Sequence, residues 1–298
     1  MPSNQATTVP TSGGPLARYP LLSFWLLAYG ISWGAFFGGR LLDLPGGLQL
    51  ATEYVVKFGP TLAGLLVVAG LGSVARREWL ARIVRWRVHP GWYLFALAGP
   101  ALLWLAAIAV HASQGAGWPA SKWDTDVLTT ALGLFALRLF AGGGFGEEPG
   151  WRGFALPRLE QRMSALSAAL LIGVVWGVWH FAAFFAPGSG KEGGIVEMVL
   201  FTVYTCALSI IFTWFFHKTN GSVLLAALLH ASFNSTENVF KLLMPGLGDT
   251  NATLLFGLCV LAFAAGLAIA CGRNLQEFRL PGQRPNVAAQ NAADSASV

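Results

Sequence analysis

The sequence predicts an all-α fold, a polytopic bundle of about eight transmembrane helices. Two observations predict it. Of the 298 residues, 55% are hydrophobic and 11% are charged, whereas soluble domains carry about 25% charged residues. In addition, apolar runs of about 20 residues recur along the chain, and a helix needs that length to cross a bilayer. These features exclude an ordinary water-soluble protein.

Eight apolar runs, each bounded by glycine, proline or charged residues, are the predicted spans. They cover residues 20–38, 53–71, 92–111, 127–145, 165–186, 195–216, 222–240 and 252–271. One transmembrane domain over residues 19–272 accounts for all of them. The polar ends, residues 1–18 and 273–298, are expected to be disordered cytoplasmic tails.

The distribution of basic residues predicts the topology. The net charge is +5, but the basic residues lie between apolar runs, so we expect topology signals and no nucleic-acid partner. The arginine-rich loop 72–90 is placed in the cytoplasm by the positive-inside rule. Alternation over eight spans then puts both termini in the cytoplasm. The same side receives most of the basic residues: Arg18, Arg76, Arg77, Arg82, Arg85, Arg87, Arg152, Arg158, Arg162, Lys218, Arg273, Arg279 and Arg284.

Two adjacent carboxylates stand in the segment GGGFGEEPGWRGFALPRLEQR, after a glycine-rich break. Charged groups cost about 2.5–3.5 kcal/mol each in a membrane span, so Glu147 and Glu148 need a reason to be there. Pro149 is expected in the first turn of a new helix. Glu148 and Arg152 are four residues apart and can form an ion pair, while Glu147 points elsewhere. The alternative is a charged first helical turn at the membrane surface.

Two histidines lie in other predicted spans. His180 is surrounded by aromatic residues in WGVWHFAAFF, and His230 lies four residues before Asn234 in LLHASFNS, so these two share a helix face. A membrane histidine is often only a hydrogen-bonding group between helices. Together with the carboxylates, however, the set contains a general base, two imidazoles and a carboxamide donor. Peptide hydrolysis needs such groups to activate water and to stabilise an oxyanion.

Three motifs in this order resemble those of the CAAX protease and bacteriocin-processing family of intramembrane proteases, which includes the type II CAAX prenyl endopeptidases. They are EExxxR from Glu147 to Arg152, an aromatic-xxx-His from Trp176 to His180, and HxxxN from His230 to Asn234. The resemblance covers the motif core, about residues 127–245, and the string GEEPGWRGFALPRLE is its most specific part. Trp176 departs from the phenylalanine that is usual in the second motif.

The resemblance implies a catalytic role for four residues. Glu147 with His180 would polarise the hydrolytic water, and His230 with Asn234 would hold water or stabilise the oxyanion. The expected activity is that of a membrane-embedded endopeptidase, which cleaves a peptide or a membrane-associated protein.

The resemblance also implies supporting residues and leaves the cofactor open. Glu148 and Arg152 would shape and support the site. Glu147, His180 and His230 could bind a divalent metal such as zinc with one open position. Alternatively, Glu147 acts as a metal-free base.

The expected setting is the bacterial plasma membrane, with the lipid bilayer and a peptide or protein substrate as partners. Because Glu147 and Glu148 lie near the cytoplasmic ends of their predicted helices, the cavity is expected to open toward the cytoplasm. One alternative function is a non-catalytic peptide-binding or bacteriocin self-immunity protein, although no motif residue is missing. A transporter is a further alternative, but it would place polar residues along a path across the bilayer.

Overall fold

The computed structural model describes residues 14–42, 44–185, 193–244 and 250–275, and all regular structure in these residues is helical. The predicted tails, 1–18 and 273–298, lie for the most part outside them. The helices are α1 (Pro15–Arg18), α2 (Pro20–Leu41), α3 (Gly46–Leu71), α4 (Ser73–Ile83), α5 (Pro90–His111), α6 (Thr125–Phe140), α7 (Gly143–Gly150), α8 (Leu156–Leu159), α9 (Ala165–Trp179), α10 (Phe181–Phe184), α11 (Ile195–Lys218), α12 (Val223–Leu243) and α13 (Thr250–Cys271).

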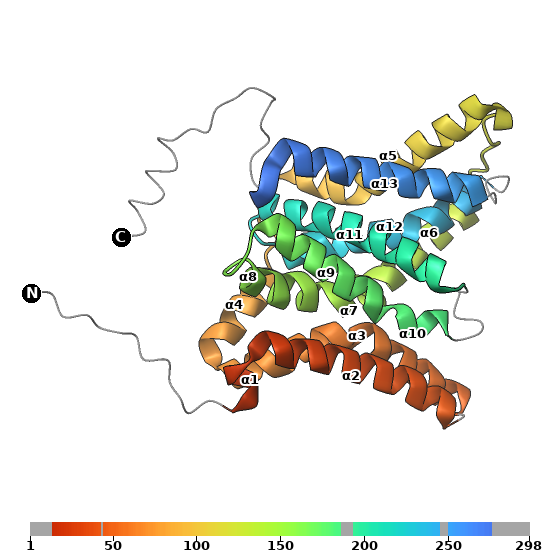
Figure 1. Ribbon diagram of the computed structural model, residues 1–298. Helices are drawn as coiled ribbons and strands as arrows, with labels where there is room; N and C mark the ends of the chain where they lie inside the picture. Colours follow the sequence, from red (N-terminus) through yellow and green to blue (C-terminus); the bar gives the residue numbers. More distant parts are fainter. Residues whose placement is uncertain (1–13, 43, 186–192, 245–249, 276–298) are drawn as a thin grey trace, which may run out of the picture.

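The long helices lie side by side and alternate in direction (Figure 1). Helices α1, α4 and α8 lie at one end of the bundle, which we call the basic end because most of the basic residues lie there. The C-terminal end of α13 lies there too, so the two ends of the described chain share one end of the bundle. Helix α10 and the connection between α2 and α3 lie at the opposite, distal end. This arrangement requires an even number of crossings.

Seven helical stretches are long and apolar enough to cross a membrane, within the described part of the chain. They are Pro20–Leu41, Gly46–Leu71, Pro90–Gly115, Thr125–Leu159, Ala165–Phe184, Ile195–Lys218 and Asn251–Asn274. They correspond to seven of the eight predicted spans. The chain is therefore an integral, multi-pass membrane protein.

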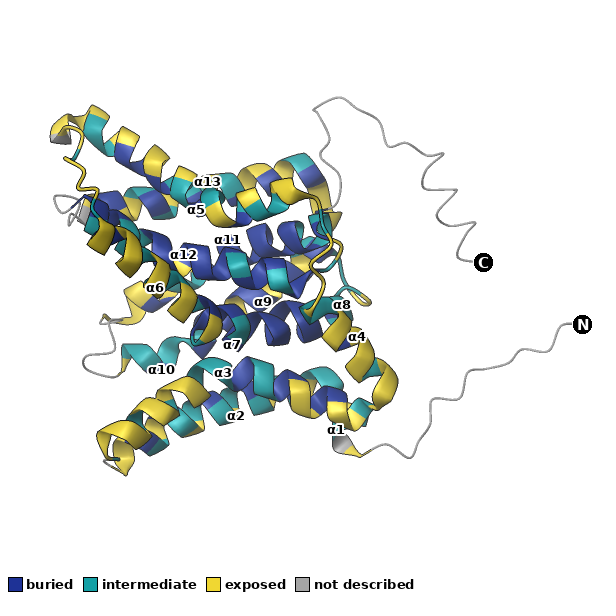
Figure 2. Cartoon of the chain, turned by 180° about the vertical axis from the view of Figure 1, so that it is seen from behind, coloured by how far each residue is buried: buried dark blue, intermediate teal, exposed yellow. Residues whose placement is uncertain are grey.

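The eighth predicted span is helix α12, which has the expected position and 21 residues but a more polar composition. Its sequence, VLLAALLHASFNSTENVFKLL, carries serine, threonine, asparagine and glutamate residues in its second half. The helix tolerates them because it lies inside the bundle, packed against α5, α6, α7 and α11. Figure 2 shows α12 and its neighbours α7 and α9 as the most buried helices.

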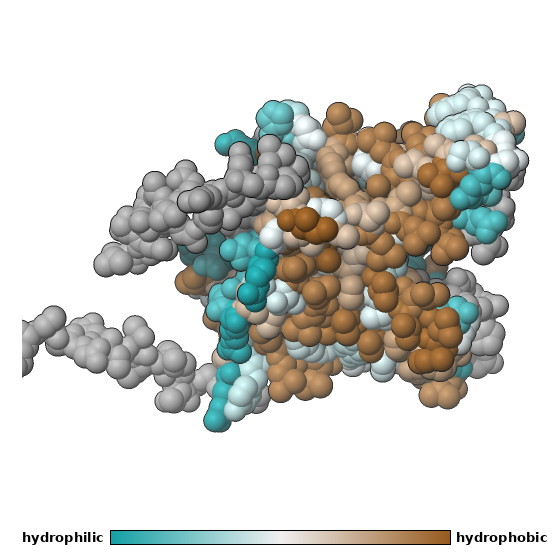
Figure 3. Space-filling model, turned by 45° about the horizontal axis from the view of Figure 1, so that its top comes forward, coloured by the Kyte–Doolittle hydropathy of each residue, from teal (hydrophilic) through white to brown (hydrophobic). Residues whose placement is uncertain are grey.

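The outer surface of the bundle is apolar. Large aliphatic side chains on α2, α5, α11 and α13 are more than half exposed, among them Leu26, Leu94, Leu200 and Leu254. On the face seen in Figure 3, hydrophobic residues cover the middle of the bundle and hydrophilic ones gather toward its ends. Lipid chains would cover this middle band.

Basic residues are concentrated at the end that carries α1, α4 and α8. In the described residues this end holds Arg18, Arg76, Arg77, Arg82, Arg85, Arg87, Arg158, Arg162, Lys218 and Arg273. The distal end holds Arg40, Lys122 and Lys241. Arg152 was predicted at the cytoplasmic surface, and this is wrong, because its side chain is fully buried inside the bundle.

The glycine-rich break is present, but the new helix begins earlier than predicted. Gly142 is extended, and α7 begins at Gly143, so Pro149 lies inside the helix and not in its first turn. Proline lacks the N–H that would bond the carbonyl four residues back. The Thr61 hydroxyl donates to that carbonyl, Phe145 O, at 2.9 Å. The helix continues past the proline because α3 supplies the missing donor.

After Pro149 the helix widens into a π-helical turn, Trp151–Ala155. Such turns leave backbone groups without their usual partners and are frequent at functional sites. The indole of Trp79 on α4 donates to Pro149 O at 2.8 Å. Gly150 lies so close to α3 that a Cβ atom there would overlap the backbone of Pro60. Helices α3 and α4 thus fix the position of α7, which carries both glutamates.

Candidate active site

A cavity of about 690 Å³ lies between α2, α3, α7, α9, α11 and α12. Its polar lining is Lys57, Arg138, Glu147, His180, Tyr204, Thr205, His230, Asn234, Glu237 and Asn238. Its aromatic lining is Trp33, Phe36, Trp176, Trp179, Phe201, Phe212, Phe233 and Phe256. All four predicted catalytic residues line this cavity, although they come from three separate helical segments.

Glu147 is a buried carboxylate whose position is fixed by two indoles. Trp176 Nε1 on α9 donates to Glu147 Oε2 at 2.5 Å, and Trp151 Nε1, one turn further along the chain, donates to the same oxygen at 3.2 Å. Hydrogen bonds from N–H groups to a carboxylate stabilise its charged form. The other oxygen, Oε1, faces His230. Glu147 therefore has one anchored oxygen and one that is turned toward the opposite wall of the cavity.

Glu148 forms the predicted ion pair with Arg152 and a contact that was not predicted. Arg152 Nη1 donates to Glu148 Oε1 at 3.2 Å, and both side chains are fully buried. His230 Nδ1 lies 2.7 Å from the same carboxylate oxygen. The Arg152 guanidinium also lies over the rings of Trp176, at 5.1 Å, and Phe212, at 4.8 Å. Buried charges are tolerated only when paired in this way.

The contact with Glu148 determines how the His230 ring presents its second nitrogen. A carboxylate only accepts hydrogen bonds, so Nδ1 carries a hydrogen when Glu148 is ionised. His230 Nε2 then lies 3.9 Å from Glu147 Oε1. That separation is too long for a direct hydrogen bond, but one water molecule can bridge it. The pair is therefore a candidate position for the hydrolytic water.

Gly143 provides the space for this pair of residues. A Cβ atom at Gly143 would overlap the His230 ring and would lie 2.8 Å from Glu147 Oε1. The first residue of α7 must therefore lack a side chain if the imidazole and the carboxylate are to keep their places.

His180 lies at the end of α9, in the wall of the same cavity. Its Nδ1 lies 2.9 Å from the carbonyl oxygen of Trp176. A carbonyl only accepts, so in the neutral ring Nδ1 carries the hydrogen and Nε2 is an acceptor. The ring packs edge-on against Trp179 and Phe201. His180 is therefore held in one orientation by its own helix and by α11.

The predicted metal ligands do not form a preassembled set. Among the residues that the structure describes, no three His, Cys, Asp or Glu side chains converge closely enough to hold a metal ion. Glu147 and His230 face each other, and His180 bonds a backbone carbonyl through Nδ1, so that a metal would have to bind its Nε2. The three side chains do not converge on one position in this structure, and their role as metal ligands stays a prediction.

Most of the cavity lining lies in the distal half of the bundle, and the two glutamates lie deeper in it than the sequence predicted. Glu147 and Glu148 were expected near the cytoplasmic ends of their helices. Instead, both lie in the interior of the candidate span Thr125–Leu159, after its break at Gly142. The lining residues of α2, α3, α9 and α13 lie in the distal halves of these helices, whereas His230 of α12 and Leu208 and Phe212 of α11 lie on the other side of the middle. Most of the lining thus lies away from the basic end, and the pair of Glu147 and His230 lies near the middle of the bundle.

Two contributions to the site were missed by reasoning from the sequence. The indole of Trp151 binds Glu147. This contact could have been predicted from the sequence, because the two residues are four apart and share a helix face. Trp176 was recognised only as an aromatic packing residue, whereas its N–H binds Glu147. Lys57 and Tyr204 also line the cavity, and they had no motif to mark them.

Comparison with known proteins agrees with this site. Residues 129–236 match the sequence pattern of the family described as type II CAAX prenyl endopeptidase Rce1-like. A curated protein from Methanococcus maripaludis, CAAX prenyl protease 2, is 31% identical over 100 residues. That match covers 32% of this chain and 37% of the relative, so the chain spans well under half of its length. The matched segment contains Glu147, Glu148, Arg152, His180, His230 and Asn234. Over residues 129–236, this chain is similar to the Rce1-like family of type II CAAX prenyl endopeptidases.

Proposed function

We propose that the protein is an intramembrane endopeptidase that hydrolyses a peptide bond of a membrane-associated protein or peptide, with Glu147 as the general base. The observation that carries the proposal is the buried pair of Glu147 and His230, whose facing atoms are 3.9 Å apart at the wall of a cavity of about 690 Å³. The similarity of residues 129–236 to type II CAAX prenyl endopeptidases supports the same reaction.

In the proposed reaction, a water molecule lies between Glu147 Oε1 and His230 Nε2. Glu147 takes a proton from the water as the water oxygen bonds to the peptide carbonyl carbon. The carbonyl becomes an oxyanion, for which the Asn234 amide is a donor on the same helix as His230. The C–N bond then breaks, and the leaving nitrogen receives the proton from Glu147. The products are a carboxylic acid and an amine.

The other residues position these groups. The indoles of Trp151 and Trp176 hold Glu147 Oε2, so that only Oε1 is directed to water. Glu148, paired with Arg152, orients His230. His180 lines the same cavity, and we propose that it contacts the substrate there. Preorganised groups of this kind lose little energy to reorganisation during the reaction.

The walls and the position of the cavity bear on the substrate. Many lining residues are aromatic, including Phe201, Phe212 and Phe233, so an apolar segment would be favoured over a charged one. The positive-inside rule assigns the basic end to the cytoplasm. The cavity, most of whose lining lies in the distal half, would then receive its substrate from the non-cytoplasmic side. We propose an extracytoplasmic membrane-associated peptide as the substrate class.

The test is cleavage of a quenched-fluorescence peptide library by the purified protein in detergent and in proteoliposomes. We compare the wild type with Glu147→Gln and His180→Gln, each with and without a chelator. Glu53→Gln is the matched control, since Glu53 is an exposed glutamate on α3. The proposal expects cleavage by the wild type and by the control, and its loss in Glu147→Gln.

Two outcomes would contradict the proposal. Full activity of Glu147→Gln would show that another group is the base. No cleavage by the wild type across a broad library of apolar peptides, together with peptide binding, would favour a non-catalytic binding or self-immunity protein.

The chelator tests the metal separately. If a chelator removes activity and excess zinc restores it, a metal completes the site.

A further inference from the structure

We propose that a second pocket, at the basic end of the bundle, binds the phosphate of an anionic phospholipid headgroup. The pocket has a volume of about 440 Å³ and lies between α1, α2, α4 and the segment that includes α8 and the turn after it. It is separate from the proposed active site and shares none of its lining residues. Four arginines line it: Arg18, Arg82, Arg158 and Arg162.

The charge in this pocket is strongly unbalanced. Glu78 is the carboxylate among its lining residues, which include four arginines. The distance from Glu78 Oε2 to Arg82 Nη2 is 3.9 Å, and the Glu78 side chain is 61% exposed. An exposed pair at this distance neutralises little charge. Arginines gathered from three segments repel one another unless an anion lies among them.

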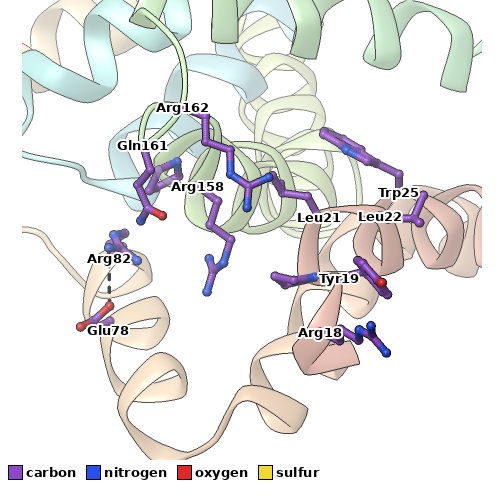
Figure 4. A pocket seen from close by; sticks show the side chains of 12 residues that line it. Arg18, Tyr19, Leu21, Leu22, Trp25, Glu78, Arg82, Arg158, Gln161 and Arg162 are labelled. Carbon is purple, nitrogen blue, oxygen red and sulfur yellow. Dashed lines mark ion pairs between the residues drawn. The ribbon is translucent and has the colours of Figure 1, made fainter. Parts of the chain in front are cut away.

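The guanidinium groups of Arg82, Arg158 and Arg162 are arranged for such an anion. Figure 4 shows Arg158 and Arg162 extending from α8 and the turn after it into the space that faces Arg82 on α4. Arg158 Nη1 donates to Phe154 O at 3.0 Å, and the guanidinium lies 3.9 Å from the centre of the Phe154 ring. Arg158 is therefore ordered by the protein itself. Phosphate groups match the planar, forked donors of arginine.

Apolar residues on one side of the pocket favour a lipid over a free phosphate ion. Leu21, Leu22 and Trp25 line it and belong to the first turns of α2. Leu22 is 55% exposed, and α2 continues from there along the apolar outer surface. A lipid could thus place its phosphate among the arginines and its acyl chains along α2. Tyr19, also in the lining, is typical of the membrane interface.

The position in the membrane agrees with this occupant. The positive-inside rule assigns the basic end to the cytoplasmic leaflet, where anionic lipids attract clustered arginines. Basic pockets between membrane helices on that side bind anionic headgroups. The lipid would join α1 and α2 to α4 and α8, which have few direct contacts with them or with each other. Arg158 follows Glu147 by less than a dozen residues in one helical stretch, so a bound lipid would also stabilise the segment that carries the glutamates.

The test measures lipid retention and thermal stability of the purified full-length protein. The protein is titrated with phosphatidylglycerol, with phosphatidylcholine and with inorganic phosphate, and bound lipid is counted by native mass spectrometry. The test variant is Arg82→Gln/Arg162→Gln, which leaves the Arg158 contacts intact. The matched control is Arg76→Gln/Arg77→Gln, because these exposed residues of α4 lose the same charge and do not line the pocket.

Phosphatidylglycerol should raise the unfolding temperature of the wild type and of the control, and phosphatidylcholine should not. The test variant should retain about tenfold less phosphatidylglycerol, since each arginine near an anionic headgroup contributes a comparable share of the attraction. Equal loss in test and control variants would mean diffuse charge attraction and overturn the site. An equal effect of inorganic phosphate or of phosphatidylcholine would overturn the lipid assignment. Arg162→Gln alone, with its unfolding temperature measured before lipid is added, distinguishes lost binding from misfolding.

Discussion

His230 Nδ1 lies 2.7 Å from Glu148 Oε1, a contact that joins α12 to α7 across 82 positions of the sequence. The two residues belong to different motifs, and neither motif by itself suggests the contact. It gives Glu148 a structural purpose beyond its ion pair with Arg152. The acid that follows the proposed base orients an imidazole, and that imidazole faces the base.

Replacing Glu148 should therefore weaken catalysis through His230. Glu148→Gln keeps the shape of the side chain but no longer fixes the hydrogen on Nδ1. We expect kcat to fall by about 10- to 100-fold, the usual effect of removing a residue that orients a functional histidine. The measurement is the double-mutant cycle with His230→Gln. Effects that simply multiply would mean that the two residues act independently.

Replacing Arg152 should destabilise the protein. Arg152→Met leaves the Glu148 carboxylate buried without its partner, and such a change costs about 3–5 kcal/mol. The measurement is thermal unfolding in detergent. Lys241→Met is the matched control, because Lys241 forms the same i,i+4 pair with Glu237 but is 46% exposed, so it should change stability by less than about 1 kcal/mol.

A further variant separates the lost charge pair from lost packing. Arg152→Met/Glu148→Gln removes both charges and should recover part of the stability, since no unpaired carboxylate remains. No recovery in the double variant would mean that the packing of the guanidinium against Trp176 and Phe212 dominates.

Adding one methyl group at Gly143 should abolish activity. In Gly143→Ala the new Cβ overlaps the His230 ring, so the imidazole must move away from Glu147. Overpacking of this kind costs about 1–3 kcal/mol, and the protein should remain folded. The measurement is peptide cleavage with folding monitored by size-exclusion chromatography. Gly133→Ala is the control, since nothing lies within 4 Å of a Cβ atom at that position. Normal turnover by Gly143→Ala would contradict the placement of His230.

The tryptophan that departs from the family pattern should matter for turnover. Trp176→Phe keeps an aromatic ring but removes the N–H that binds Glu147 Oε2. We expect kcat to fall by about tenfold with little change in KM, because the substrate does not contact this nitrogen. Trp104→Phe is the control, since the Trp104 N–H makes no hydrogen bond within the described residues. A rise in KM alone would mean that Trp176 contacts the substrate.

The side of the membrane on which the cavity opens can be determined by cysteine labelling, which does not require an assay of peptide cleavage. In a background that lacks Cys206, Cys259 and Cys271, we introduce Asn238→Cys in the cavity or Arg77→Cys at the basic end. A membrane-impermeant maleimide should label Asn238→Cys in intact cells and Arg77→Cys only in inverted vesicles. The opposite pattern would place the cavity on the cytoplasmic side, and it would leave the hydrolytic mechanism unaffected.

Much of the fold could be predicted from the sequence because membrane helices are long, apolar and bounded by turn residues. The predicted spans begin and end within a few residues of the helices for most of the chain, as at Pro20–Leu41 and Ile195–Lys218. The helix around Glu147 was placed less well. Pro149 suggested a helix start, but the Thr61 hydroxyl satisfies the carbonyl that the proline leaves unbonded. A donor from another helix is invisible in the local sequence.

The candidate site shows a similar division. The four residues that the motifs marked, Glu147, His180, His230 and Asn234, line one cavity, and the spacing of HxxxN explains why His230 and Asn234 share a helix face. Their relative geometry could not be predicted, since it depends on how α7, α9 and α12 cross. The depth of the site was missed for a different reason. The predicted span ended at residue 145, whereas the helical segment continues to Leu159, so the glutamates lie inside the span and not at its end.

The polarity of α12 has a consequence for biogenesis. A helix with this composition does not partition into lipid easily by itself. Helix α11 precedes it and is apolar, and the turn between them is short, with positive φ at Asn220 and Gly221 and with Ser222 capping α12. The two helices therefore suit insertion as a hairpin, in which α11 carries its partner into the bilayer. The segment that bears the HxxxN motif would then enter the membrane only in the company of its neighbours.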